Sequence, residues 1–145
     1  MDLQSIQARV PDYQTFMTVD ELNQSSYDLA AAYPEVVKVE TAGYSREGRP
    51  ILHLTIGHGS KNALMFGCPH PNEPIGAMTL EFLTRLLAED EALRTELGYT
   101  FHVIKCIDPD AITLNQGWFK GPFEVYNYLR HYYRPAFHEQ VAWTF

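Results

Sequence analysis

The sequence contains few cysteines, few basic residues and no long apolar run. Two cysteines among 145 residues are too few for a disulfide framework, and a reducing cytoplasm suits them best. Eleven Lys and Arg against 18 Asp and Glu give a net charge of −7, which argues against nucleic-acid binding because phosphates require a basic face. No apolar run approaches the roughly 20 residues of a membrane span, and the first residues lack the basic and apolar regions of a signal peptide. We therefore expect a cytoplasmic protein with no nucleic-acid or membrane partner.

The remaining composition is that of a globular domain. Apolar residues make up 46% of the chain and charged residues 20%, a balance that excludes intrinsic disorder and coiled-coil character. The length fits about one domain. Because no internal repeat or low-complexity segment interrupts it, the sequence predicts a single core.

The first half of the chain predicts a helix followed by a β-hairpin. Thr18 and Glu21 form a capping-box pattern that starts a helix, and Pro34 ends it. Residues 35–42 and 51–56 alternate between apolar and polar side chains, as half-buried strands do. The turn residues between them predict an antiparallel hairpin with a long loop.

The middle of the chain predicts a strand, two helices and a further strand: Asn62–Phe66, Ile75–Leu87, Glu91–Leu97 and Tyr99–Ile107. The first run is almost continuously apolar, which is typical of a strand covered on both faces. This order implies a parallel strand pair with a crossover connection. We therefore expect an α/β fold whose mixed sheet has an antiparallel hairpin edge, a parallel centre and helices on both faces.

From Asp108 onward the periodicity fades and aromatic residues crowd the sequence. We expect an irregular segment that either forms a binding surface or wraps over a core still to be built. The sequence stops at Trp143-Thr-Phe145 without a polar tail. Because such a run is an unusual terminus, we expect the natural chain to continue past Phe145.

The motif with the clearest chemistry is His70-Pro-Asn-Glu73, placed between a predicted strand and a predicted helix. Ligands collect beyond the carboxyl ends of strands in open α/β sheets. An imidazole and a carboxylate three residues apart can converge on one side of a turn, and zinc accepts that donor pair. In the alternative interpretation, His70 is an ordinary loop histidine and Glu73 is placed by the dipole of the following helix. The spacing alone leaves both open.

Two segments of the chain resemble the zinc carboxypeptidase (funnelin) family. The run from Tyr33 to Ile51, with its Glu-Gly-Arg-Pro-Ile turn, and the run from His70 to Gly76 stand in that family's order and at similar spacing. Ile107-Asp-Pro-Asp110 is similar to the family's Asn-Pro-Asp-Gly turn. The resemblance implies that residues 1–145 form the N-terminal portion of one catalytic domain. It further implies one zinc ion, a peptide or small amide as substrate, and hydrolysis at a C-terminal residue.

The resemblance makes His70 and Glu73 the first two zinc ligands. It places the third ligand, a histidine, and the general-base glutamate beyond Phe145. His131 and His138 are nearer candidates for the third ligand, although each can equally be a surface or loop histidine. We therefore expect weak zinc affinity and little or no turnover from this chain alone.

The oxyanion of the reaction requires a positive group, and two residues are candidates. The family has an arginine after a loop tryptophan, whereas here Trp118 is followed by Phe119 and Lys120. Lys120 can supply charge but not a guanidinium fork. Arg134 is the second candidate, with a solvated or stacking role as its alternative.

Other functions stay open on the sequence. One is a zinc-dependent N-acyl amino acid deacylase of the aspartoacylase type, which also uses a His-x-x-Glu site. Another is a catalytically inactive binding module of the same fold that holds a partner on its aromatic tract. A homodimer is also expected as a possibility, because exposed sheet edges favour self-association.

Overall fold

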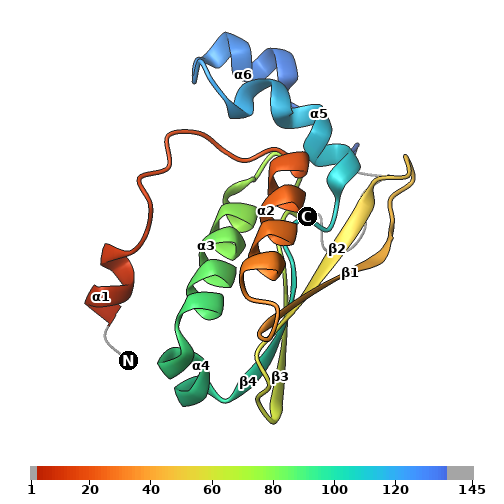
Figure 1. The fold of residues 1–145 in the computed structure, drawn as a ribbon. Helices are drawn as coiled ribbons and strands as arrows, with labels where there is room; N and C mark the ends of the chain where they lie inside the picture. Colours follow the sequence, from red (N-terminus) through yellow and green to blue (C-terminus); the bar gives the residue numbers. More distant parts are fainter. Residues whose placement is uncertain (1–2, 137–145) are drawn as a thin grey trace.

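The computed structural model describes residues 3–136, which form a four-stranded sheet with helices packed against it (Figure 1). The strands are β1 (Val37–Tyr44), β2 (Pro50–Ile56), β3 (Lys61–Phe66) and β4 (Tyr99–Ile104), in the order β1-β2-β4-β3. The β1/β2 and β2/β4 pairs are antiparallel, and β3/β4 is parallel. The predicted α/β class, antiparallel hairpin and parallel pair are therefore confirmed.

Six helices lie in the described chain: α1 (Leu3–Ala8), α2 (Val19–Ala32), α3 (Ile75–Glu89), α4 (Glu91–Leu97), α5 (Pro109–Phe119) and α6 (Val125–His131). Figure 1 shows α2 and α3 side by side across one face of the sheet, with α5 and α6 beyond the end of β4. We expected helices on both faces of the sheet. Within residues 3–136, the helices that pack on the sheet are α2 and α3, and both lie on this face. None of the helices in this range is long and apolar enough to cross a membrane.

The start of α2 shows how the sequence sets an element boundary. The Glu21 backbone N–H donates to Thr18 Oγ1 at 3.2 Å, and the Thr18 backbone N–H donates to Glu21 Oε2 at 2.7 Å. Both members of the capping box thus satisfy a free donor of the first turn. The predicted start of this helix is confirmed.

The core lies between the sheet and the α2/α3 layer. Leu54, Ile56 and Val103 of the central strands are fully buried there with Leu87 of α3. These side chains alternate along β2 and β4 with others on the opposite face, so a half-buried sheet results.

The prediction that Asn62–Phe66 is covered on both faces is wrong for the described chain. β3 is an edge strand in residues 3–136, and its Leu64 and Phe66 are 65% and 49% exposed. Leu64 lies in register with His102, which stacks on His53 on the face away from α2 and α3. A continuous apolar run does not reveal which of its two faces is covered.

The expectation of an irregular segment after Asp108 is also wrong, because α5 and α6 occupy much of it. Asp108 caps α5 by accepting from the Ala111 backbone N–H at 3.1 Å, and Pro109 stands in the first turn. This Asp-Pro pair is a helix-start signal. The aromatic residues Trp118 and Phe119 are buried and meet Phe16 edge to face, so here they build a small second core.

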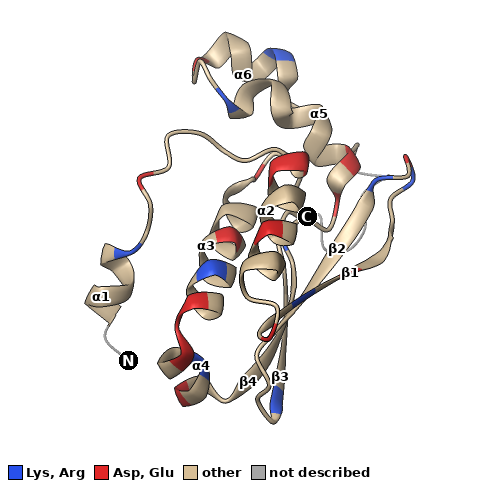
Figure 2. Ribbon diagram, in the orientation of Figure 1, with Lys and Arg blue, Asp and Glu red and all other residues tan. Residues whose placement is uncertain are grey.

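Charged residues are spread over the fold, with one buried group among them. In Figure 2, acidic residues lie along α2, α3 and α4, with single basic residues among them. Glu81 of α3 is 1% exposed and Lys105, just after β4, is 3% exposed. Lys105 Nζ donates to Glu81 Oε2 at 2.6 Å, while Ser25 and Arg85 donate to the same carboxylate. This network ties α2, α3 and β4 together.

Candidate metal site

The loop between β3 and α3 carries His70 and Glu73, and the strand ladder fixes where it starts. The Gly67 N–H donates to Ile104 O at 2.9 Å, and the Ile107 N–H donates to Gly67 O at 3.0 Å. A Cβ at Gly67 would lie 2.6 Å from the Lys105 carbonyl oxygen. Only glycine therefore fits at the point where the loop leaves the sheet.

A hydrogen-bonded turn brings the two predicted ligands to one side of the loop. The Glu73 N–H donates to His70 O at 3.0 Å, which closes the His70–Glu73 turn. Pro71 and Pro74 are buried within it, and proline restricts the unfolded alternatives of a loop. His70 is half-buried and Glu73 is exposed, so both donor groups are accessible.

Arg134 is the cation that meets both donors. Its Nη2 donates to His70 Nδ1 at 3.0 Å, and its Nη1 donates to Asn72 Oδ1 at 2.9 Å and to Glu73 Oε1 at 3.2 Å. A guanidinium has no acceptor. His70 Nδ1 must therefore be the unprotonated ring nitrogen, with its lone pair directed at the cation.

The donor set fits two positions of a zinc site. An imidazole nitrogen and a carboxylate oxygen converge on one positive group, and both are zinc donors. Within residues 3–136, no cluster of three or more His, Cys, Asp and Glu side chains could hold a metal. The expectation of a third ligand beyond Phe145 stays a prediction.

Lys120, the other predicted cation, lies elsewhere. Its Nζ donates to Glu21 Oε1 and Oε2 at 2.9 and 2.7 Å, at the start of α2. Burial raises the pKa of the Glu21 carboxyl, but hydrogen bonds from Lys120 and Thr18 outweigh it and lower that pKa. In the described structure Arg134, not Lys120, contacts the donor pair.

The nearer histidine candidates do not join the site within residues 3–136. His131 Nδ1 lies 3.1 Å from Asn127 O on its own helix, and its ring occupies the space beside Gly117. His131 is therefore neither a site residue in the described chain nor the surface or loop histidine of the alternative interpretation, because it packs from α6 against α5. His138 lies outside the described residues.

The two cysteines are buried beneath the loop rather than presented to it. Cys68 is 1% exposed and Cys106 is 7% exposed, in the apolar cluster formed with α2, α3 and α5. Cys68 has a positive φ of 57°, which is uncommon for a residue other than glycine. A hydrogen bond from Cys106 lowers the pKa of the Cys68 thiol, and the same contact, together with burial, raises the pKa of Cys106.

Sequence reasoning missed two polar residues near the site. Asn72 supplies an acceptor to Arg134 from inside the motif, and its place between His70 and Glu73 is the only local signal. Asp110 accepts from Ser45 Oγ at 2.7 Å and from Arg49 Nη1 at 2.8 Å. It thereby joins the hairpin tip to the start of α5, and so links two of the motifs quoted above.

Two cavities flank this region. One of about 640 Å³ is polar and includes Glu47, Asp108 and Asp110 in its lining, together with Tyr133 and Pro135. Burial raises the pKa of Asp108, and the charge of Asp110 adds to this, although the Ala111 N–H opposes it.

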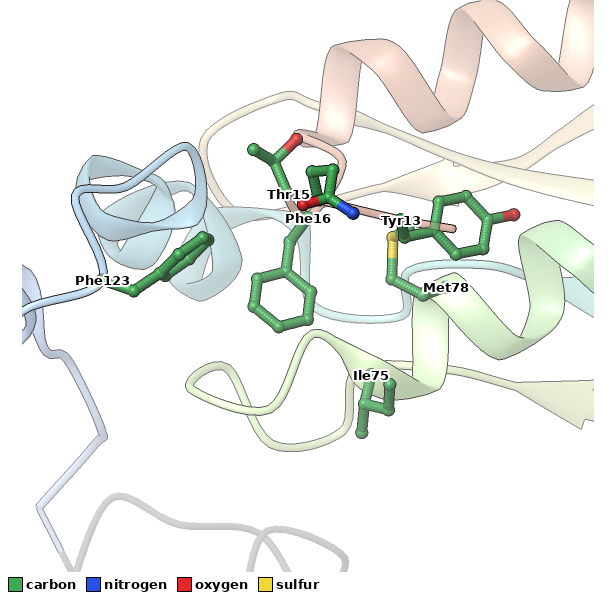
Figure 3. Close-up of a pocket in the computed structure, with 7 residues that line it drawn as sticks. Tyr13, Thr15, Phe16, Ile75, Met78 and Phe123 are labelled. Carbon is green, nitrogen blue, oxygen red and sulfur yellow. The ribbon is translucent and has the colours of Figure 1, made fainter. Parts of the chain in front are cut away.

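The second cavity, of about 370 Å³, is apolar and lies at the start of α3 (Figure 3). Figure 3 shows Phe16 between Phe123 and the start of α3, where Ile75 and Met78 project. The cavity is therefore closed on one side by the N-terminal segment of the chain.

Comparisons with known proteins find similarity to carboxypeptidases. A family model described as zinc carboxypeptidase matches residues 22–123. Carboxypeptidase B of Astacus astacus is 30% identical over 104 residues, which cover 68% of this chain and 34% of that protein.

Two solved structures share the fold. Bovine thrombin-activatable fibrinolysis inhibitor, in a complex with tick carboxypeptidase inhibitor, superposes with a TM-score of 0.67 at 14% identity, over 76% of this chain and 37% of that one. Carboxypeptidase A from Helicoverpa armigera gives 0.65 at 21% identity, over 79% and 32%. The chain spans about a third of the length of these relatives.

Proposed function

This chain belongs to the zinc carboxypeptidase family, and we propose that it is the N-terminal portion of a catalytic domain that hydrolyses peptide bonds at a C-terminal residue. Family membership itself supports a metallopeptidase-type hydrolase. The observation that carries the finer proposal is the convergence of His70 Nδ1 and Glu73 Oε1 on one cation. Both residues lie within the part of the chain that matches the family model.

His70 and Glu73 would hold the zinc ion, and the turn between them keeps the two donors on one side. Bound zinc supplies a water of lowered pKa and polarises a carbonyl. Arg134 contacts both donors from the protein side and also donates to Asn72 Oδ1. Because Arg134 lies at the donor pair and Lys120 does not, we prefer Arg134 over Lys120 as the positive group for the oxyanion.

The chain alone is proposed to bind zinc weakly and to turn over little or no substrate. Zinc sites in hydrolases use three protein ligands, and the described residues contribute two. We propose that the third ligand and the general base follow residue 145. The free cysteines, both buried, suit a reducing compartment, so we place the protein in the cytoplasm.

Zinc titration of the 145-residue chain tests the proposal. Wild type is expected to bind one equivalent, and His70→Ala and Glu73→Ala are expected to lose about tenfold or more in affinity. His58→Ala is the matched control, because that ring bonds to the Glu35 carbonyl oxygen away from the loop. Loss of affinity in the control alone, or none in the two ligand variants, contradicts the assignment.

A substrate panel separates the remaining functions. Peptides with free C-termini and N-acyl amino acids are expected to give little or no product with this chain. Appreciable turnover of peptides would show that the 145-residue chain already contains the catalytic set. Turnover of N-acyl amino acids alone would favour a deacylase, and the absence of zinc binding would favour an inactive binding module.

A further inference from the structure

The contacts of Arg134 with the two donors lead to an inference about metal binding at this turn. We propose that the Arg134 guanidinium and a divalent cation compete for the same donor atoms, so that Arg134 is a displaceable plug of the metal site. This inference rests on the proposed function, because it requires His70 and Glu73 to be metal ligands.

Arg134 and a metal ion compete most directly for the His70 ring nitrogen. A neutral imidazole has one acceptor nitrogen, and Arg134 Nη2 already donates to that atom at 3.0 Å. A metal ion needs the same lone pair, so guanidinium and metal exclude each other there. A dication bound at His70 and the Arg134 guanidinium would also repel each other, because both are positively charged. Binding of a dication therefore requires the Arg134 side chain to leave.

The Arg134 side chain also keeps the His70 and Glu73 donors in place. Its fork reaches three acceptors of a single turn, on His70, Asn72 and Glu73, and its side chain is only 20% exposed. Charge-assisted hydrogen bonds of this kind are stronger than neutral ones. Arg134 thus holds the imidazole and the carboxylate on the same side of the loop, in the arrangement that a cation needs.

The backbone beside Arg134 is anchored, so displacement moves the side chain. Asn115 of α5 is fully buried and bonds Tyr133 twice. The Tyr133 N–H donates to Asn115 Oδ1 at 3.0 Å, and Asn115 Nδ2 donates to Tyr133 O at 2.9 Å. A rotation of the Arg134 side chain about this fixed point is sufficient to free the donors.

Zinc affinity of the 145-residue chain, measured by calorimetric titration, tests the inference. Arg134→Met keeps the apolar stem and removes the charge, and it is expected to bind zinc about tenfold more tightly than wild type. Arg130→Met removes a neighbouring exposed cation and is expected to leave the affinity unchanged. Arg134→Gln gives a second neutral variant, so that a folding defect of one substitution does not decide the result. Equal or weaker affinity in both Arg134 variants overturns the inference.

A double variant distinguishes failure of the inference from failure of the proposed function. In a His70→Ala background, adding Arg134→Met is expected to give no gain, because the contested donor is gone. A gain of the same size in that background overturns the inference. Wild-type binding that depends on His70 but not on Arg134 removes the inference alone. Zinc binding that is indifferent to His70 removes the proposed function and the inference together.

Discussion

At the residue scale, Gly67 fixes the position of the His70–Glu73 turn relative to the sheet. Its backbone continues the parallel ladder to Ile104 and Ile107, and the Lys105 carbonyl fills the space that a side chain would need. The neighbouring Cys68, with its positive φ, then turns the chain away from the strand. Two successive backbone constraints thus position the turn that carries the proposed ligands.

Gly67→Ala is expected to destabilise the fold and shift the turn. The added Cβ would lie 2.6 Å from Lys105 O and 3.0 Å from the Gly76 carbonyl carbon, and overpacking of this kind costs about 1–3 kcal/mol. Urea unfolding followed by circular dichroism measures the loss. Gly43→Ala is the matched control, because nothing lies within 4 Å of its Cβ position, and its change should stay within about 0.5 kcal/mol. Equal effects of the two substitutions would contradict the account.

His53 makes stability depend on pH. Burial lowers the pKa of His53 and the nearby His102 lowers it further, with Glu40 opposing. Because its folded pKa is below the unfolded value, the unfolded chain binds the proton more readily. Its contribution is therefore full above about pH 6.5 and is lost as the pH falls below that.

Unfolding free energies between about pH 8 and pH 5 check this pH dependence. His53→Asn should lose less stability on acidification than wild type. His58→Asn, at a histidine bonded to the Glu35 carbonyl, should keep the wild-type loss. A His53→Asn profile that superposes on wild type would show that His53 does not contribute to the pH dependence as described.

The contacts of Arg134 show the limit of residue-scale prediction. The spacing and strand-to-helix context of His70 and Glu73 left their role open, and the family resemblance made them the predicted ligands. Arg134 reaches His70 across 64 positions of the sequence, and no local pattern links the two. Only the arrangement of α5, α6 and the following residues brings them together.

At the scale of elements, strong local signals predicted the structure well. The capping box at Thr18 and Glu21 and the alternation of β1 and β2 each rest on neighbouring residues, and both are confirmed. The run from Asn62 to Phe66 indicated a strand but not its exposed edge, because coverage depends on distant elements. Helices α5 and α6 are short and interrupted, so their weak periodicity was obscured by aromatic residues that pack in the small core.

The buried Glu81–Lys105 pair is an element-scale contact that we expect to be sensitive to substitution. Burial raises the pKa of Glu81, but Lys105, Ser25 and Arg85 outweigh it and keep the carboxyl ionised. Lys105→Met leaves that charge without its most buried partner, and the expected cost is about 3–5 kcal/mol. Chemical denaturation measures it.

A double-mutant cycle isolates the pair. Glu81→Leu combined with Lys105→Met removes both charges and is expected to be less destabilised than Lys105→Met alone. Additive losses would mean that the two side chains do not act together. Lys38, in an exposed pair with Glu40, gives the control: Lys38→Met should leave the unfolding free energy close to that of wild type.

At the scale of the whole molecule, the β3 edge is the exposed feature with the clearest consequence. Leu64 and Phe66 are apolar and exposed on an edge strand of the described sheet. Unpaired, apolar edges favour pairing with another copy of the chain. We predict concentration-dependent self-association, in keeping with the homodimer expected from the sequence.

Sedimentation velocity of wild type and Leu64→Lys checks this association. The lysine should shift the population towards monomer, because a charge on an edge strand opposes pairing. Thr41→Lys, on the exposed opposite edge strand β1, is the control and should leave the population unchanged. A Leu64→Lys sample that associates like wild type would place the contact elsewhere.

The central claim is that the His70–Glu73 turn is a cation site, and anomalous diffraction from zinc-soaked crystals of the chain tests it most directly. We predict a zinc peak about 2.0–2.2 Å from His70 Nδ1 and from a Glu73 carboxylate oxygen, with the Arg134 guanidinium moved off Nδ1. A zinc-free turn in crystals that hold the ion elsewhere, or His70 and Glu73 side chains directed apart, would contradict the account.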